Sequence, residues 1–261
     1  MNITLYQVDA FADEVFKGNP AAVCPLTTWL PDDTLQKIAA ENNLPETAFY
    51  VPSGNGFDIR WFTPAVEVDL CGHATLATAF VLFYHEGFKG DTLHFHSHRS
   101  GALTVKEEGG LLVLNFPKDQ FAEVPLTDDL IASSDKRPVA AFKGKTDYML
   151  VFEKEENVKN MKPNLPVIAG LNARGLIVTA KGNECDFVSR FFAPASGINE
   201  DPVTGSAHTT LIPYWAQQSG KSELVAMQLS GRTGVLHCRL LGERVSMAGK
   251  GVLYLKGEIF I

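Results

Sequence analysis

The sequence has few cysteines, and their spacing is as informative as their number. Only Cys24, Cys71, Cys185 and Cys238 occur among 261 residues, and no two of them form a C-x-x-C pair. Closely spaced cysteines are typical of zinc sites and redox pairs, so this spacing indicates neither. Free thiols persist in reducing compartments. We therefore predict free cysteines in a cytoplasmic protein.

Long hydrophobic runs, an excess of positive charge and phosphate-binding glycine loops are also missing. The longest apolar stretch, around Ala74 to Phe83, is much shorter than a membrane span. The opening residues, Met1 to Phe11, alternate like a strand and lack the pattern of a signal peptide. The net charge of −7 argues against a nucleic-acid partner, and neither G-x-x-x-x-G-K-[ST] nor G-x-G-x-x-G occurs. These absences predict no membrane, nucleic-acid or nucleotide partner.

A motif is present twice in the chain. Arg60, Phe62 and Pro64 recur 130 residues later as Arg190, Phe192 and Pro194, and Gly72 recurs 133 residues later as Gly205. In each copy a strand leads through a loop of small residues into a helix, and backbone N–H groups at a helix start favour a bound anion. The repeat predicts two similar halves, 1–118 and 119–261, with Pro117 to Pro125 as the linker.

The order of the predicted elements favours an α+β fold over a regular doubly wound sheet. Each half contains many short strands and one long apolar helix. The first helix, after Gly72, has almost no polar face through Phe83, so we expect it to be buried on most sides. The second starts at Gly205–Ser206 and extends through Trp215.

Several motifs resemble the PhzF-type phenazine-biosynthesis isomerase family. They are Val8-Asp-Ala-Phe11, Gly18-Asn-Pro-Ala21, Asn43-Leu-Pro-Glu-Thr47, Phe62-Thr-Pro64 with Val68-Asp-Leu-Cys-Gly-His-Ala-Thr75, and Glu200-Asp-Pro-Val-Thr-Gly-Ser-Ala-His208. The resemblance implies a diaminopimelate-epimerase-like fold, with two pseudo-symmetric halves that each wrap a β-barrel-like sheet around a central helix. It also implies an active site between the halves, a last strand near 254–261 that returns to the first half, and a homodimer.

The resemblance assigns the general base and acid to Glu46, which follows Pro45 where a helix gives way to a strand. Proton transfer needs a positioned group with a tunable pKa. The alternative is an ordinary solvated carboxylate after a turn.

The family's histidine, aspartate and serine around the substrate correspond to His73, Asp201 and Ser206. We predict His73 and Asp201 as catalytic residues beside Glu46, with His73 binding substrate or helping to move a proton, and Ser206 as a substrate-binding residue. The helix starts at Gly72 and Gly205 would hold an anionic group. For two of these residues an alternative stays open, because His73 could cap its own helix and Asp201 could cap the turn at Pro202.

Cys71 offers a second mechanism. Related epimerases use two cysteines, one in each half, and Cys71 lies where the first would be. The matching position in the second half is Thr204, whose hydroxyl is too weak an acid to replace a thiol. This disfavours a two-cysteine enzyme.

His94, His96 and His98 alternate along one strand and share a face, so they could bind a transition metal. Because Leu93 and Phe95 would take the core-facing side, we expect the histidines to point outward. We predict neither a metal nor a cofactor.

The leading hypothesis is a cofactor-independent isomerase that moves a proton on a small anionic metabolite bearing a carboxylate. The resemblance implies the chemistry more firmly than the substrate, which is a dihydro-hydroxyanthranilate in phenazine synthesis. Two alternatives remain: a cysteine-dependent epimerase or racemase using Cys71, and a non-catalytic metabolite-binding protein.

Overall fold

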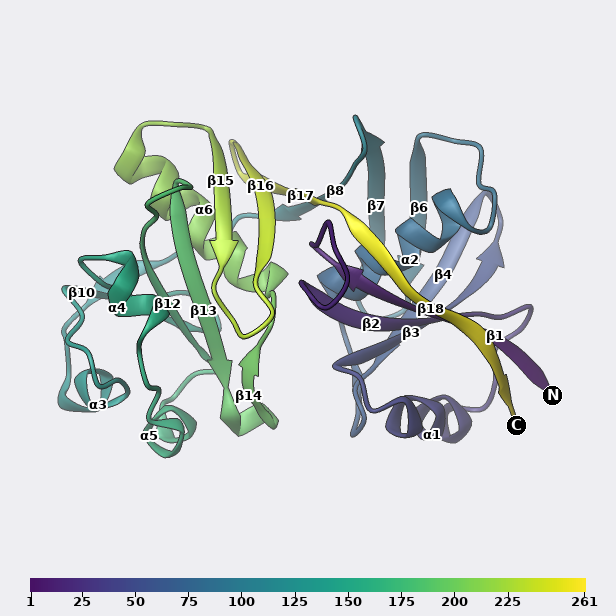
Figure 1. Cartoon of the computed structure of the whole chain (residues 1–261), viewed down its shortest axis with the longest axis horizontal. Helices are drawn as coiled ribbons and strands as arrows, with labels where there is room; N and C mark the ends of the chain where they lie inside the picture. Colours follow the sequence, from purple (N-terminus) through teal and green to yellow (C-terminus); the bar gives the residue numbers. More distant parts are fainter. The chain divides into compact units, whose positions relative to one another are not determined.

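The computed structural model describes residues 1–261 and forms two compact units. Unit 1 comprises Met1–Asn115 and Ala248–Ile261, and unit 2 comprises Phe116–Met247. The returning segment of unit 1 contains β18 (Gly251–Phe260), which pairs antiparallel with β1 (Asn2–Ala10) from end to end. Figure 1 shows these two strands side by side, with both chain termini at their ends.

The remaining elements up to residue 117 are mostly short strands. In chain order they are β2 (Asn19–Pro25), α1 (Asp32–Asn42), β3 (Glu46–Ser53), β4 (Gly56–Phe62), β5 (Glu67–Val68), α2 (Gly72–Tyr84), β6 (Thr92–Ser97), β7 (Gly101–Glu108) and β8 (Leu111–Pro117).

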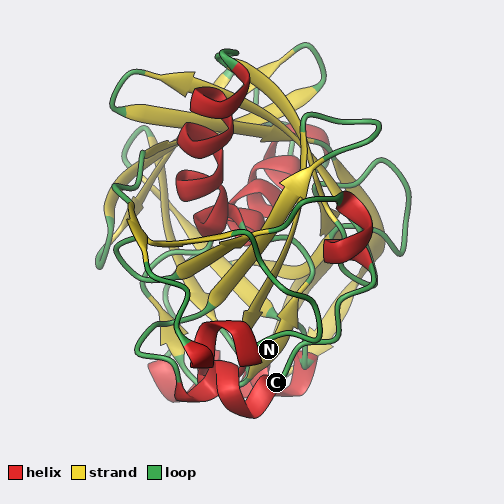
Figure 2. Cartoon of the chain, turned by 90° about the vertical axis from the view of Figure 1, so that its left-hand side faces the viewer, coloured by secondary structure: helices red, strands yellow, loops and turns green.

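The chain continues with further strands and four helices, which belong to unit 2 as far as Met247. They are β9 (Ala122–Val124), α3 (Asp128–Ala132), β10 (Ala140–Lys143), β11 (Tyr148–Val151), α4 (Glu155–Lys159), α5 (Leu165–Gly170), β12 (Leu176–Lys181), β13 (Phe187–Ala193), the 3₁₀ turn η1 (Pro194–Ser196), β14 (Ile198–Asp201), α6 (Gly205–Ser219), β15 (Glu223–Gln228), β16 (Gly234–Leu241) and β17 (Arg244–Gly249). Strands dominate the molecule (Figure 2). The predicted α+β class is confirmed.

The strands of the two units pair in the same order. In unit 1, β2 pairs antiparallel with β1 and parallel with β3, and β4 pairs antiparallel with β3 and β5 and parallel with β6. In unit 2, β11, β12, β13, β14 and β15 repeat these pairings, with β10 in the place of β1. The repeated sequence motif therefore marks a repeated arrangement of strands.

The repeated arginine stabilises the same part of each unit. Arg60 on β4 donates through Nε and Nη2 to both carboxylate oxygens of Glu67, at 2.8 and 3.0 Å, and its guanidinium lies over Phe62. Arg190 on β13 binds Glu200 in the same way, at 2.7 and 3.0 Å, and lies over Phe192. The repeated arginine thus has the same structural role in both units, because its ion pair ties each strand to the short strand after it.

The long helix of each unit is largely buried, which confirms the prediction made for the first of them. Nine residues of α2 are buried, and so are nine of α6. The polar Thr75 and Thr78 of α2 bond back to the carbonyl oxygens of Cys71 and Ala74, at 2.6 and 2.8 Å. Because these hydroxyls are satisfied within the helix, α2 can lie in an apolar environment without an unpaired polar group.

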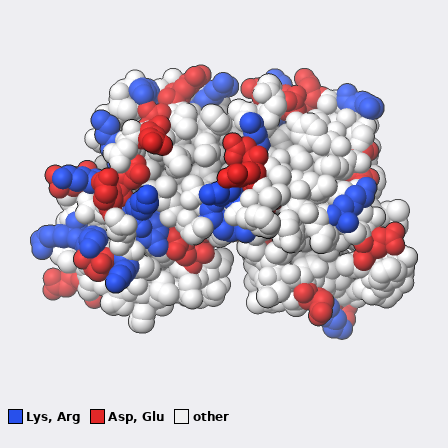
Figure 3. Space-filling model, in the orientation of Figure 1, with Lys and Arg blue, Asp and Glu red and all other residues white.

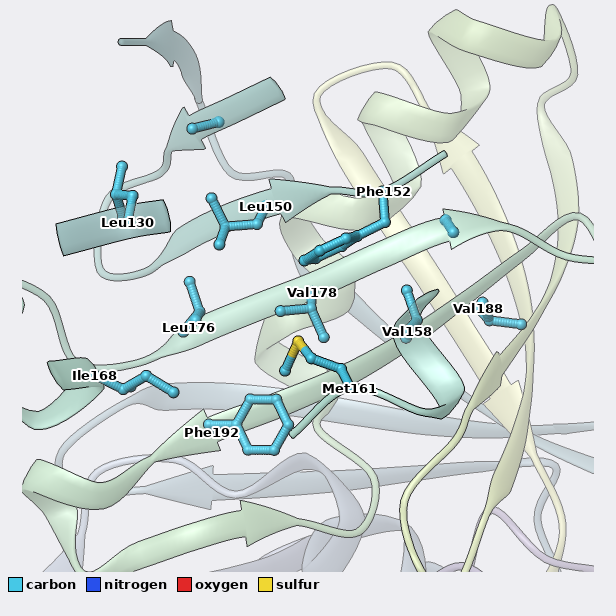
Figure 4. Close-up of a cluster of buried hydrophobic side chains, with 12 residues drawn as sticks. Leu130, Leu150, Phe152, Val158, Met161, Ile168, Leu176, Val178, Val188 and Phe192 are labelled. Carbon is cyan, nitrogen blue, oxygen red and sulfur yellow. The ribbon is translucent and has the colours of Figure 1, made fainter. Parts of the chain in front are cut away.

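The opposite face of each sheet packs against shorter helices. In unit 1, α1 contributes Leu35, Ile38 and Ala39 to a cluster with Phe49 and Val51 of β3. In unit 2, residues of α3, α4 and α5 pack with β11, β12 and β13 in the cluster shown in Figure 4. Strand residues therefore alternate between the face toward the short helices and the opposite face.

The segment predicted as a linker, Pro117 to Pro125, is fixed within unit 2, so that prediction is wrong. It contains β9, which pairs with β10. The backbone N–H of Asp119 donates to the carbonyl oxygen of Thr209 at 3.1 Å. That carbonyl is available because Pro213, four residues further along α6, has no N–H to donate. Since the proline's missing bond is replaced from outside, α6 continues beyond Trp215 to Ser219.

None of the helices is long and apolar enough to cross a membrane. On the face of unit 2 shown in Figure 3, acidic and basic side chains are interspersed. The cytoplasmic location and the absence of a nucleic-acid partner stay predictions.

Candidate active site

Glu46 is the first residue of β3 and lies on the face of the sheet opposite α1. Phe49 and Val51 pack against α1, so strand alternation places Glu46 on the other side, where β3 contacts α2. Glu46 is only 9% exposed. A solvated carboxylate after a turn, the alternative left open by the sequence, does not describe this residue.

His73 meets Glu46 at the start of α2. The Nε2 atom of His73 lies 3.1 Å from the Glu46 carboxylate, and His73 is 5% exposed. Its Nδ1 lies 3.2 Å from the side-chain nitrogen of Asn19 and 3.5 Å from the sulfur of Cys71. Four polar side chains from β2, β3 and the start of α2 therefore meet in one buried cluster. His73 does not cap its own helix, because no side-chain cap is made there.

The Glu46 carboxylate favours the charged form of His73. Burial by itself lowers the pKa of the imidazole, but Cys71 and Glu46 raise it by charge and hydrogen bonding, and the net pKa lies well above its ordinary value. The opposing effect of Glu46 is strong because the pair is buried, where charges interact at low dielectric. The Glu46–His73 contact therefore stabilises the protonated imidazole against the effect of burial.

The first prediction is that the pKa of His73 is lower in the Glu46→Gln variant than in the wild type, because one of the two groups that oppose the effect of burial is lost. The pKa of His73 is higher in the folded than in the unfolded protein, where it is about 6.5. Protonation of His73 therefore stabilises the fold fully at pH values below about 6.5, and this stabilisation is lost as the pH rises through the pKa of the folded protein. NMR titration of the His73 ring in both proteins measures the change. An unchanged His73 pKa would show that the pair is not coupled.

Cys71 is the N-cap residue of α2 and is buried. Burial and the nearby charge of Glu46 raise the pKa of its thiol, against a smaller lowering by His73. A catalytic cysteine requires a thiolate, which needs the opposite shift. The electrostatics therefore disfavour Cys71 as a base.

The second prediction is that Cys71→Ser keeps most of the activity and lowers turnover by less than about tenfold, because no proton passes through the sulfur. Steady-state kinetics and the melting temperature should be measured together to separate activity from folding. A loss as large as that of a Glu46 variant, in a folded protein, would instead assign the mechanism to the cysteine.

The start of α6 in unit 2 has a different polar network. The Thr204 hydroxyl donates to the Asp201 carboxylate at 2.6 Å, while the Gln228 side chain accepts from the Thr204 N–H at 2.8 Å. Gln228 also donates to the backbone oxygen of Asp201 at 2.8 Å. Ser206 is exposed at the second helical position and accepts a hydrogen bond from Arg174 at 2.9 Å. Asp201 and Ser206 therefore lie on either side of the same helix start.

The two helix starts correspond position by position. Cys71 and Thr204 are the N-cap residues, Gly72 and Gly205 begin the helices, and His73 and Ser206 follow. The thiol of Cys71 in unit 1 thus corresponds to the hydroxyl of Thr204 in unit 2.

Glu46 has no equivalent carboxylate either. The strand registers Thr47↔Phe62 and Leu176↔Phe192 align Glu46 with Gly175. The candidate acid/base group therefore occurs in unit 1 alone. The predictions that both helix starts face one cleft and bind an anion stay predictions.

His208 of α6 contrasts with His73. Its Nδ1 lies 2.8 Å from the carbonyl oxygen of Thr204, and burial lowers the pKa of its ring to about 4. It is therefore a neutral, structural histidine.

Glu46, Cys71 and His73 place three potential metal-ligand atoms within 4.8 Å of one another. A metal there would have to compete with the Glu46–His73 pair and ionise a thiol whose pKa is raised, so the donor set suits a proton-transfer site better. On β6, His94 and His96 are exposed, as the alternation predicts. His96 lies 3.4 Å from Asp58, and His98 lies 3.7 Å from Glu67. These carboxylate contacts account for two of the three histidines without a metal.

Three residues near the candidate sites received no role from the sequence. Asn19 lies within the quoted Gly18-Asn-Pro-Ala21 motif, and a polar residue in an otherwise apolar strand was the available signal. Arg174 and Gln228 gave no such signal, because arginine and glutamine are common on surfaces.

Comparison with known proteins places this chain in a family. The model of the phenazine biosynthesis-like proteins (PhzC-PhzF) matches residues 8–257. Two uncharacterized isomerases of Pseudomonas aeruginosa are 48% and 54% identical, with at least 99% of each chain covered.

Solved structures agree with this similarity. A crystal structure of a phenazine biosynthesis protein of the PhzF family from Enterococcus faecalis has a TM-score of 0.98, 46% identity and full coverage of both chains. A hydroxyproline epimerase from Agrobacterium vitis shares only the fold, with a TM-score of 0.61, 8% identity and coverage of 99% and 92%. The chain belongs to the phenazine biosynthesis-like (PhzC-PhzF) family.

Proposed function

We propose that this protein is a cofactor-independent isomerase that moves a proton on a small carboxylate-bearing metabolite. The observation that carries the proposal is the buried Glu46–His73 pair, with its two groups 3.1 Å apart. The relatives named as isomerases support the reaction class. The names of these relatives do not specify a substrate.

In the proposed reaction Glu46 accepts a proton from a substrate carbon and then donates it to a different carbon. The electron pair of the broken C–H bond moves into the conjugated system, and the new C–H bond forms elsewhere, so the product is an isomer. His73 holds the Glu46 carboxylate in one orientation, and Asn19 holds the ring of His73. This arrangement is that of a general acid/base with a positioning partner.

Unit 2 supplies binding groups in this proposal. Ser206 and the first N–H groups of α6 would receive the substrate's anionic group, and the Asp201–Thr204–Gln228 network would keep the helix start rigid. We further propose that the two units are pseudo-symmetric, that their sheets wrap around α2 and α6, and that both helix starts act on one substrate molecule.

Two alternatives give different outcomes. A cysteine-dependent epimerase would require a second thiol where Thr204 stands and a thiolate at Cys71, whose pKa is raised. A non-catalytic metabolite-binding protein would bind ligand without exchanging carbon-bound protons.

A screen of small unsaturated and cyclic carboxylates in heavy water tests the proposal. The protein should introduce deuterium at carbon and form a rearranged product, both visible by NMR. Inversion at a single stereocentre would indicate an epimerase. Binding without any deuterium incorporation would support the non-catalytic alternative.

A further inference from the structure

The guanidinium of Arg174 lies beside Ser206 at the start of α6. Arg174 directly precedes Gly175, the position in unit 2 that corresponds to Glu46. Its Nη2 donates to Ser206 Oγ at 2.9 Å, and its guanidinium carbon lies 5.2 Å from the centre of the Phe191 ring. Unit 2 therefore has a cation near the position where unit 1 has its candidate acid/base carboxylate.

A buried carboxylate fixes this cation in one orientation. Arg174 donates to Asp147 through Nε, at 2.9 Å, and through Nη2. The side chain of Asp147 is 4% exposed, whereas that of Arg174 is 39% exposed. The Arg174 backbone N–H also donates to the Thr146 oxygen, at 2.8 Å. Both the backbone and the side chain of Arg174 are thus held in place. Binding of a ligand would therefore cost little conformational entropy at the guanidinium.

Counting the donors shows which edge of Arg174 is available. A guanidinium has five N–H groups. The Nε–H and both Nη2–H groups bind Asp147 and Ser206, which leaves the two N–H groups of Nη1 without a protein acceptor. Ser206 accepts from Arg174, so its own hydroxyl hydrogen can turn toward a ligand. One face therefore offers N–H and O–H donors together.

The other arginine of unit 2 near the repeat motif does not have this property. Arg190 is buried, and its Nη1 donates to the carbonyl oxygens of Val158 and Met161, at 3.1 and 2.8 Å. Its other donors bind Glu200. The N–H groups of Arg190 therefore bind acceptors within the fold, whereas the Nη1 N–H groups of Arg174 are available to a ligand at the candidate site.

We propose that Arg174 binds the carboxylate of the substrate through Nη1, together with the hydroxyl of Ser206. A planar carboxylate fits two neighbouring donors, and a hydrogen bond from a guanidinium to a carboxylate is stronger than one to a neutral amide. Arg174 is then a specificity-determining residue that selects organic acids over their neutral amides. This inference rests on the proposed function, because the proposed substrate carries the carboxylate.

The test compares 2-aminobenzoate with 2-aminobenzamide, which has nearly the same shape but no charge. Both are titrated by calorimetry into the full-length wild type, Arg174→Gln and Arg137→Gln, an exposed arginine of the same unit. We expect the wild type and Arg137→Gln to bind the acid at least tenfold more tightly than the amide. Arg174→Gln should lose roughly tenfold or more in affinity for the acid, the scale of a charged hydrogen bond, and keep its affinity for the amide.

A second variant distinguishes a loss of acid binding from a loss of folding. Arg174→Gln leaves the buried Asp147 without its partner, which destabilises a fold. The double variant Arg174→Gln with Asp147→Asn removes both charges and should show the same loss of acid binding with a near-native melting temperature. An undiminished preference for the acid in these variants would overturn the proposal. So would a wild type that shows no preference, including one that binds neither compound at about 50 mM.

The inference and the isomerase function can fail separately. A protein that prefers the acid through Arg174 but exchanges no proton in heavy water would keep this inference and lose the isomerase. A protein that exchanges protons, and whose Arg174→Gln variant has an unchanged KM, would keep the isomerase and lose this inference.

Discussion

Glu46→Gln is expected to bind ligand within a few-fold of the wild type while its turnover falls by roughly two to four orders of magnitude. Glutamine keeps the size of glutamate and can still hydrogen-bond to His73, 3.1 Å away in the wild type. It cannot accept and return a proton at the catalytic position. The loss should therefore appear in kcat and leave KM nearly unchanged.

The measurement is NMR of a substrate turned over in heavy water. The wild type should introduce deuterium at carbon, and Glu46→Gln should not. Glu41→Gln is the matched control, because Glu41 belongs to the same unit, in α1, and is exposed. Equal incorporation by wild type and Glu46→Gln would remove Glu46 from the mechanism.

Neighbouring substitutions should separate proton transfer from positioning. His73→Asn should reduce turnover less than Glu46→Gln, because it removes the group that orients the carboxylate but leaves the carboxylate itself. Asp201→Asn should affect binding as well, since Asp201 belongs to the network that holds the start of α6. The order of these effects distinguishes one acid/base group from a shared relay.

The sequence predicted the parts of the site that lie within local motifs. Gly72, His73 and Cys71 are neighbours in the chain, and a helix start places them together whatever else the fold does. The contact between His73 and Glu46 depends on strand alternation and on the packing of α2 against β3. The family resemblance assigned both residues to the active site, but the contact itself was not predicted. Asn19 and Arg174 were missed for the same reason, because their partners lie 54 and 32 residues away.

The errors in the fold also have local causes. The segment Pro117 to Pro125 lacks a periodic pattern, and a short strand such as β9 leaves little hydrophobic signal. The helix predicted through Trp215 continues to Ser219, and the Asp119 N–H supplies the hydrogen bond to Thr209 that Pro213 cannot donate. Tertiary contacts of this kind are invisible to periodicity.

Arg190→Leu is expected to have the largest effect on stability, lowering the free energy of unfolding of unit 2 by about 3 kcal/mol. This is the low end of the cost of breaking a buried ion pair from one side, because the Glu200 side chain is 27% exposed. The substitution leaves the Glu200 carboxylate without its guanidinium and two carbonyl oxygens, of Val158 and Met161, without donors. It also removes the cation over Phe192.

The repeat provides the matched comparison, because Arg60→Leu removes the equivalent side chain from unit 1. We expect a smaller loss there. Glu67 keeps a second partner in Arg99, at 2.8 Å, and the other ion pair of Arg60 is with Asp32, an exposed carboxylate. Exposed ion pairs contribute little.

Urea unfolding followed by tryptophan fluorescence measures the difference. Trp215 is the only tryptophan of unit 2, so replacing Trp29 and Trp61 with phenylalanine makes the signal report that unit alone. The double variant Arg190→Leu with Glu200→Leu should recover part of the loss, since no carboxylate is then left unpaired. Arg190→Leu within about 1 kcal/mol of its parent would show that the two carbonyl oxygens and Glu200 find other donors, and that the repeated arginine is not what holds β13 to β14.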